Sequence, residues 1–191
     1  RSGGVVGVGG SRHQIFEGGI AYWRPGGRVS FIHGSILNAW AAAGWERSWL
    51  GLPTSNETAS TKGGVFQRFE RGVAYWSPAT GAQFVGEPVL SAWGAYGYQT
   101  GSMGYPRSGG VVGVGGSRHQ IFEGGIAYWR PGGRVSFIHG SILNAWAASG
   151  WEHSKVGLPT GRAVRQADGT MTQAFEKGSI SVAPNGKVTI R

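Results

Sequence analysis

The sequence predicts an α+β fold built from tandem 53-residue repeats, each with the element order β-β-β-α. Three observations predict it: a four-residue signal at a constant interval, runs of β-branched and aromatic residues divided by glycines, and a helical apolar pattern before each signal. The signal ends at three prolines that are 53 residues apart, Pro53, Pro106 and Pro159. A fixed period of this size is typical of an array of one supersecondary motif.

The signal reads Leu50-Gly51-Leu52-Pro53 and returns as Met103-Gly104-Tyr105-Pro106 and Val156-Gly157-Leu158-Pro159. It predicts one domain with repeats at 1–53, 54–106 and 107–159 and a truncated fourth repeat at 160–191. The second repeat is a distant relative of the first. The first and third repeats differ at four positions, which are Ala43/Ser149, Arg47/His153, Trp49/Lys155 and Leu50/Val156.

Each repeat opens with a segment that we interpret as a loop. Residues 3–11 are rich in glycine, and glycines allow backbone amides to approach an anion, so a phosphate-binding loop is an alternative. However, no strand precedes this segment and no amphipathic helix follows it directly. The second repeat has the unrelated sequence 55–63 at the same place, which also favours a simple loop.

The middle of each repeat predicts a tight antiparallel meander. In the first repeat, β-branched and aromatic runs at 12–17, 20–23 and 28–32 are divided by a Gly pair and by Arg-Pro-Gly-Gly. The truncated repeat has Ser181 where the first has Tyr22, and Val182 where it has Trp23.

Neighbouring side chains on a strand point to opposite faces. We therefore expect the tryptophans of this run to face inward and the tyrosines to lie at a surface or at a junction between repeats. The positions are Trp23, Trp76 and Trp129, and Tyr22, Tyr75 and Tyr128.

A short helix is predicted at 35–44, where the apolar residues follow the spacing of one helix face. Ser35 is the expected N-cap and Gly44 the expected stop. Because about ten residues cannot hold a helix in water alone, packing must stabilise it. The expected anchors are Trp40, Trp93 and Trp146. The tail repeats only the meander, and we expect it either to cap the array or to pair with the first repeat and close a ring.

Composition and charge exclude several classes of protein. With 40% hydrophobic and 14% charged residues, the chain of 191 residues is not a disordered polymer. No apolar run of about 18 residues and no signal-peptide pattern is present, so we expect a soluble fragment or mature piece without a transmembrane segment. The absence of cysteine excludes disulfides and thiolate metal sites. The net charge of +9 favours an anionic partner, but the basic residues are scattered and form no nucleic-acid-binding arm.

The repeat signal, the run Gln-x-Phe-Glu-x-Gly-x-Ala-Tyr-Trp-x-Pro and the later helix Trp, all at one spacing, resemble the LGFP-repeat family over the whole chain. This resemblance implies a propeller-like pseudo-symmetric array in a secreted protein of the actinobacterial cell envelope. It also implies non-covalent attachment to the cell wall, with arabinogalactan or peptidoglycan as the polysaccharide partner and a catalytic domain elsewhere in the protein. The family's Ser-x-Glu after the proline is present only as Ser55-Asn56-Glu57, since Gly4, Gly110 and Ala163 occupy the glutamate position in the other repeats.

Glycan binding needs aromatic faces that stack on sugar C–H surfaces, together with planar groups that bond hydroxyls. We predict such sites from the tyrosines of the meander, the arginines that follow them, and the aromatic residue after each helix. The alternative is that these aromatics fill the junctions between repeats. The predicted ligand-binding residues are Tyr22, Arg24, Arg28, Trp45, Tyr75, Tyr98, Tyr128, Arg130, Arg134 and Trp151.

A non-catalytic wall-binding module without cofactor or metal is therefore our prediction, and a fragment of a peptidoglycan or cell-wall hydrolase is the alternative. The recurring carboxylates Glu17, Glu70, Glu123 and Glu176 are required in every copy, as are the recurring glutamines, which favours a structural role such as bonding a turn. The histidines occur only in the first and third repeats and have no second ligand at metal spacing. A third interpretation, a nucleic-acid binder drawn by charge, predicts binding that salt weakens steeply.

Overall fold

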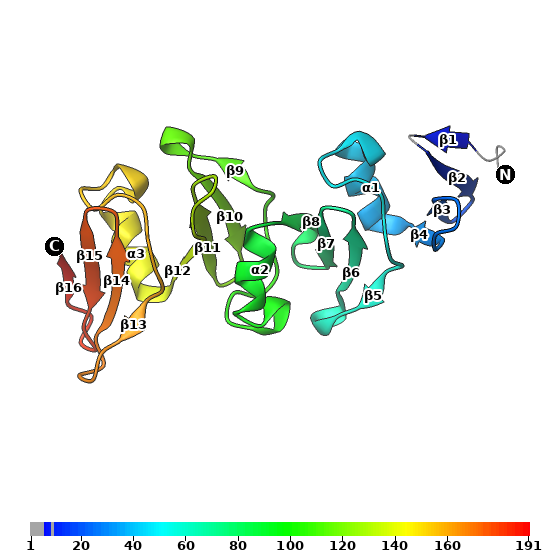
Figure 1. Ribbon diagram of the computed structural model, residues 1–191. Helices are drawn as coiled ribbons and strands as arrows, with labels where there is room; N and C mark the ends of the chain where they lie inside the picture. Colours follow the sequence, from blue (N-terminus) through cyan, green and yellow to red (C-terminus); the bar gives the residue numbers. More distant parts are fainter. Residues whose placement is uncertain (1–5, 9) are drawn as a thin grey trace. The chain divides into compact units, whose positions relative to one another are not determined.

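The computed structural model describes residues 6–8 and 10–191, and this part of the chain contains four four-stranded antiparallel sheets, one per repeat (Figure 1). In each sheet the strands are hydrogen-bonded in sequence order. The sheets are β1 Val6–Val8, β2 Ser11–Phe16, β3 Gly19–Trp23 and β4 Ser30–Ile32; β5 Thr58–Ala59, β6 Val65–Phe69, β7 Gly72–Ser77 and β8 Gly81–Gly86; β9 Val111–Val112, β10 Arg118–Phe122, β11 Gly125–Trp129 and β12 Ser136–His139; and β13 Val164–Arg165, β14 Met171–Phe175, β15 Gly178–Val182 and β16 Val188–Ile190.

The predicted three-stranded meander is present, but each repeat has one more strand in front of it. In the third repeat this strand is β9, and Val111 and Val112 pair with His119 and Arg118. Its two residues are too few for a recognisable alternation, so the sequence favoured a loop there. The prediction of three strands per repeat was therefore wrong by this short first strand.

The glycine-rich segment is best seen in the third repeat, because residues 3–5 and 9 of the first copy lie outside the described residues. There β9 is followed by the single 3-10 turn Val114–Gly116 and then directly by β10. This copy therefore has the order strand, turn, strand, and not the order strand, loop, α-helix. The setting that phosphate binding requires is thus absent from it.

Three short helices follow the first three sheets: α1 Gly34–Ala42, α2 Val89–Gly94 and α3 Gly140–Ala148. The predicted stop at Gly44 is confirmed by its positive φ angle of 101°, and Gly97 and Gly150 at the same place in the next two repeats have φ angles of 83° and 102°. The predicted cap is wrong: α1 begins one residue before Ser35, its N-cap is His33, and no side chain caps it.

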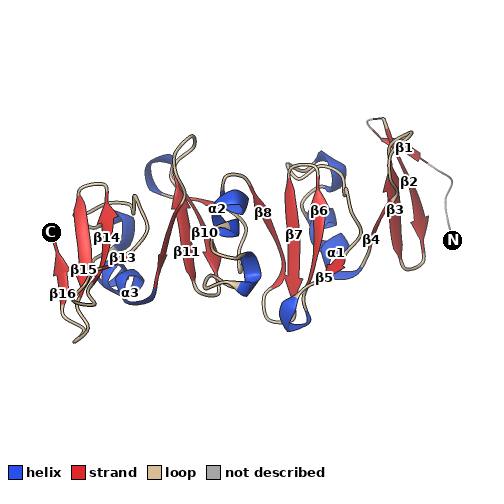
Figure 2. Ribbon diagram, turned by 60° about the horizontal axis from the view of Figure 1, so that its bottom comes forward, coloured by secondary structure: helices blue, strands red, loops and turns tan. Residues whose placement is uncertain are grey.

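The described residues form two compact units, which we name unit 1 (up to residue 91, with 105–107) and unit 2 (92–104 and 108–191). In unit 1, α1 lies against the sheet of the following repeat, β5–β8, and in unit 2, α3 lies against β13–β16 (Figure 2). A repeat therefore buries its helix with the help of the next sheet. The core of unit 1 consists of Ile20, Tyr22, Ile32, Ile36, Trp40, Leu50, Leu52, Phe69 and Ala74.

The helix tryptophans are the predicted anchors and are fully buried in all three copies, Trp40, Trp93 and Trp146. The indole Nε1 of Trp40 donates a hydrogen bond of 3.1 Å to the carbonyl of Gly51, inside the repeat signal. Trp146 makes the same bond to Gly157 at 3.0 Å. The signal thus ties the end of one repeat to its own helix.

The same signal also starts the next sheet. Leu52 accepts a backbone bond from Glu70, and Thr54 donates one to Arg68, so that Pro53 pairs with Phe69 beside β6. Gln67 uses its amide nitrogen to bond both the Phe31 carbonyl (3.0 Å) and the Ser55 carbonyl (2.8 Å). This bond pattern recurs at Gln173 and confirms a structural role for the recurring glutamines.

Strands dominate the described structure, and its helices are short. The chain is thus a tandem array of small, mostly β repeats, with one short helix after each of the first three sheets. The propeller-like arrangement of the array stays a prediction.

Candidate functional site

Two equivalent cavities lie beside the repeat signal, one in each unit. The cavity of unit 1 has a volume of about 280 Å³ and that of unit 2 about 180 Å³. Every residue lining the second lies 106 positions after its counterpart in the first. The unit 1 cavity is lined by Tyr22, Trp23, Arg24, Gly27, Arg28, Ser30, Leu52, Pro53, Thr54 and Glu70, and the unit 2 cavity by Tyr128, Trp129, Arg130, Gly133, Arg134, Ser136, Leu158, Pro159, Thr160 and Glu176.

Strand β3 supplies both aromatic residues of the unit 1 cavity. Tyr22 is only 3% exposed and packs edge-on against Trp40, with ring centroids 5.1 Å apart. Burial, followed by the negative charge of Glu46, raises the pKa of Tyr22 to about 12. Trp23, on the other face of the strand, is half-buried and lines the cavity.

The predicted inward position of the tryptophans and the surface alternative for the tyrosines are therefore wrong. Tyr22, Tyr75 and Tyr128 are 3%, 6% and 4% exposed, whereas Trp23, Trp76 and Trp129 are half-buried. In the first and third repeats the helix after the meander covers the tyrosine face: Tyr22 packs 5.1 Å from Trp40 and Tyr128 packs 5.0 Å from Trp146. Tyr75 is covered instead by Phe66 and Tyr105. Tyr22 and Tyr128 lie in cores shared with the next sheet, at the junction between repeats, which was the other predicted place.

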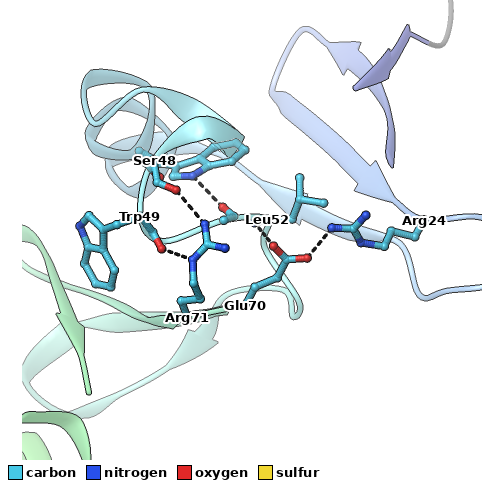
Figure 3. Close-up of polar contacts among 8 residues, drawn as sticks. Arg24, Ser48, Trp49, Leu52, Glu70 and Arg71 are labelled. Atoms are coloured by element: carbon cyan, nitrogen blue, oxygen red, sulfur yellow. Dashed lines mark hydrogen bonds and ion pairs between the residues drawn. The ribbon is translucent and has the colours of Figure 1, made fainter. Parts of the chain in front are cut away.

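Arg24 and Glu70 both line the cavity of unit 1 and form an ion pair with each other (Figure 3). The Glu70 Oε1 atom accepts a bond of 2.7 Å from Arg24, and Oε2 accepts one of 3.2 Å from the Leu52 amide. Partial burial alone would raise the pKa of Glu70, but the bonds from Arg24 and Leu52 hold it below its ordinary value. This carboxylate is committed to the turn of the repeat signal, which confirms the structural role predicted for it.

Unit 2 repeats this arrangement at Arg130 and Glu176. Arg130 donates through Nε (3.1 Å) and Nη2 (3.0 Å) to Glu176 Oε1, and through Nη1 (2.8 Å) to the Gly115 carbonyl. The Leu158 amide donates to Glu176 Oε2 at 3.1 Å. The pKa of Glu176 is lowered as well: partial burial opposes this, and the bonds from Leu158 and Arg130 outweigh it. Arg24 and Arg130 are thus already bonded within the protein.

Arg28 and Arg134 are the cavity arginines that face solvent. Both are exposed, both line their cavity, and neither has an ion-pair partner among the described residues. A guanidinium with free donors beside a half-buried indole can bond a hydroxyl or an anion while the ring covers an apolar surface. Of the predicted meander residues, these two have the freest polar groups.

The aromatic residues after the helices form a second, separate set. Trp45, Tyr98 and Trp151 are 39%, 42% and 39% exposed, and all three have left-handed backbone angles, with φ of 59°, 52° and 56°. Each packs edge-on against the tryptophan of its own helix, at centroid distances of 5.6, 5.5 and 5.5 Å. A non-glycine residue in this conformation costs free energy, so its recurrence indicates a structural or functional requirement for an aromatic ring at this place.

Sequence reasoning brought Tyr22, Arg24 and Arg28 together correctly, as it did their counterparts in the third repeat. It placed Tyr75 among the ligand-binding residues, but Tyr75 is buried between Phe66 and Tyr105. It missed Trp23 and Trp129, although each directly precedes a predicted arginine. It also missed the cavity wall at Pro53 and Thr54, which the repeat signal itself could have indicated.

Equivalent sheets and turns in each repeat, with equivalent cavities two repeats apart, define a tandem-repeat protein of the kind used as a binding module. The chain belongs to the LGFP-repeat family: the family's sequence profile, described as "LGFP repeat", matches residues 3–48, 50–101 and 103–154. No curated protein matches the chain.

Two solved structures are similar to the chain at a low level. One is a streptogramin B lyase, with 11% identity over 99% of this chain and 53% of the other, and a TM-score of 0.21. The second is a catalytically inactive virginiamycin B lyase from Staphylococcus aureus with quinupristin, with 9% identity over 98% and 54% and a TM-score of 0.20. The chain spans about half the length of both proteins. These scores are too low to support any argument about fold or activity.

Within residues 6–8 and 10–191, no helix has the length and hydropathy needed to span a bilayer. Nor does this part of the chain gather three or more His, Asp or Glu side chains in a way that could hold a metal ion.

Proposed function

We propose that this protein is a non-catalytic module that anchors a secreted envelope protein to the arabinogalactan or peptidoglycan of an actinobacterial cell wall. The observation that carries the proposal is the pair of equivalent cavities, each with a half-buried tryptophan beside an exposed arginine. Membership in the LGFP-repeat family supports a binding module. The resemblance described above supplies the wall polymer and the location.

In each cavity, Trp23 or Trp129 would stack on the C–H face of a sugar, and Arg28 or Arg134 would bond its hydroxyls. Arg24 and Arg130 would hold the cavity wall through their glutamates rather than bind the ligand directly. Trp45, Tyr98 and Trp151 would offer further exposed aromatic edges along a polymer. Such sites are weak singly, but two or more on one chain can gain on the order of a hundredfold through avidity on a repeating polymer.

The test is retention of the full chain on insoluble arabinogalactan–peptidoglycan, before and after mild acid removes the arabinogalactan. The double variant Trp23→Ala/Trp129→Ala should lose binding by roughly tenfold or more, since each site loses its stacking surface. Arg28→Ala/Arg134→Ala should also weaken binding. The charge-matched control Arg47→Ala/Arg165→Ala removes one exposed arginine from each unit outside the cavities and should bind as the wild type does. Equal retention of all four proteins would refute the cavities as binding sites.

The same assay addresses the other two classes. A wall hydrolase would release soluble sugar or peptide fragments and would lose turnover on Glu17→Gln or Glu123→Gln, whereas the proposed module releases none. A nucleic-acid binder would bind DNA and lose it steeply as salt rises. Stacking on a neutral glycan should persist in the same salt.

A further inference from the structure

Unit 1 contains a smaller cavity of about 160 Å³ on a different part of its surface. It lies where α1 begins, and its polar side chains are the imidazole of His33, the hydroxyl of Ser35 and the carboxylate of Glu57. Trp76, which is half-buried, forms an aromatic wall. None of these four residues lines the cavity beside the repeat signal.

The carboxylate of Glu57 is short of partners. Its side chain is only 15% exposed, yet its one ion-pair contact among the described residues is the Nε2 atom of His33, 3.7 Å away, which is too long for a hydrogen bond. Within residues 6–8 and 10–191 no hydrogen bond reaches this carboxylate, in contrast to Glu70, which accepts bonds from Arg24 and Leu52. Burial raises the pKa of Glu57, and His33 only partly opposes this.

A carboxylate placed in this way does not stabilise the fold, because its desolvation is not repaid by hydrogen bonds. The carboxylate of Glu57 is instead placed to accept hydrogen bonds from a ligand. A ligand with two neighbouring hydroxyls, placed beside this pair, could donate one to Glu57 and bond His33 with the other. Trp76, with Ile36 and Val65 beside it, offers the apolar surface that a sugar ring needs on its C–H face.

Unit 2 has no such combination. His139 occupies the place of His33, but Ala163 replaces Glu57 and Val182 replaces Trp76. The two units therefore share the cavity beside the repeat signal and differ at this one. Duplication of the first repeat preserved the histidine, and the carboxylate and indole come from the second repeat alone.

We propose that His33, Glu57 and Trp76 form an additional carbohydrate site, present in unit 1 only, which binds a sugar ring through a pair of neighbouring hydroxyls. The inference rests on the proposed function for its ligand class, and it adds a site with different chemistry: a carboxylate and an imidazole in place of an arginine. The ligand class is a neutral glycan, because the cavity wall is aromatic and aliphatic and Glu57 can accept hydroxyl donors.

The experiment is a titration of the full chain with soluble arabinogalactan and with soluble peptidoglycan fragments. Calorimetry measures the affinity, and the indole N–H signals in a ¹H–¹⁵N spectrum report which tryptophans contact the ligand. The signal of Trp76, identified from its loss in Trp76→Phe, should shift on titration. Glu57→Gln should weaken the binding by about five- to tenfold, as expected for loss of a hydrogen bond to a charged group. His139→Ala, which removes the unit 2 counterpart of His33, should leave affinity unchanged.

Unfolding is a poor explanation for a weak Glu57→Gln variant, because removing this partly desolvated charge should keep or raise the melting temperature. If Glu57→Gln binds as the wild type does while Arg28→Ala/Arg134→Ala binds more weakly, the additional site is wrong and the proposed function stands. The reverse pattern supports the additional site and contradicts the arginine cavities. Competition by ethylammonium chloride, but not by methyl glycosides, would overturn the glycan class in favour of an amine. A wild-type chain that binds neither polymer overturns both proposals.

Discussion

Unit 1 and unit 2 contain nearly the same repeat followed by two different sheets. Two of the four differences within that repeat, Trp49/Lys155 and Leu50/Val156, lie where the repeat meets the next sheet. Trp49 in unit 1 lies over glycines of the second repeat: a Cβ atom added to Gly86 or Gly72 would come within 2.7 Å or 3.2 Å of its ring. Arg71 donates hydrogen bonds to the Trp49 and Ser48 carbonyls (Figure 3).

In unit 2, Lys155 occupies the place of Trp49, and Lys177 that of Arg71. The large ring and the arginine that bonds its carbonyl are thus replaced together. The residues around the cavity, by contrast, are identical in type in the two units. The comparison separates two roles within one repeat: contacts with the following sheet change with that sheet, and the cavity does not.

The largest expected loss of stability comes from removing a helix tryptophan, and it tests whether the two units have separate cores. Trp40→Ala should destabilise unit 1 by about 3–5 kcal/mol, because it empties a fully buried site and removes the bond to Gly51. Trp146→Ala should do the same in unit 2. Hydrogen exchange measures it: amides of β6 and β7 should lose protection in the first variant, and those of β14 and β15 in the second. Loss of protection in both units from one substitution would show that the units do not carry separate cores.

Repetition explains how much of this fold the sequence could predict. The period, the buried tryptophans and the glycine stops each recur, so that chance matches to any one copy could be excluded. The face of Tyr22 could not be predicted in the same way, since alternation says that Tyr22 and Trp23 point apart but not which face the helix covers. The cavity was missed for a related reason: Trp23 and Glu70 lie in different repeats and meet only when a helix packs on the next sheet.

Smaller losses of stability are expected from substituting two glycines of unit 1, and they show which turn contacts a side chain of the next sheet. Gly51 and Gly44 both have positive φ angles, 75° and 101°, but a Cβ atom on Gly51 would lie 2.4 Å from Glu70 Oε2 and one on Gly44 would meet open space. Gly44→Ala should therefore cost about 1 kcal/mol from backbone strain alone. Gly51→Ala should cost more, because the carboxylate that bonds the Leu52 amide must move as well.

Chemical denaturation of both glycine variants gives the measurement. Gly157→Ala, the counterpart in unit 2, should resemble Gly51→Ala, since its Cβ atom would lie 2.6 Å from Glu176 Oε2. Equal losses at Gly51 and Gly44 would mean that the glutamate does not constrain the turn.

The smallest expected effects come from two carboxylates of unit 1 whose pKa values move in opposite directions. The pKa of Glu70 is lowered in the folded protein, so its contribution to stability is present above the ordinary value of about 4.5 and is lost as pH falls through the lowered value. The pKa of Glu57 is raised, so its ionised form destabilises the folded state at neutral pH. This penalty disappears as pH falls through the raised pKa and the carboxylate takes up a proton.

Glu70→Gln should accordingly lower the free energy of unfolding at pH 7 by about 1 kcal/mol, a modest figure because the carboxylate is partly exposed and solvent screens it. That loss should shrink toward pH 3. Glu57→Gln should raise the free energy of unfolding at pH 7 by less than about 1 kcal/mol, and the gain should vanish below pH 4. Unfolding curves of the two variants from pH 3 to pH 7 would test the signs. Only Glu70 has a counterpart in unit 2, so Glu176→Gln should show the same pH dependence as Glu70→Gln. If Glu57→Gln instead lowers the free energy of unfolding at pH 7, Glu57 stabilises the fold and the prediction for it is wrong.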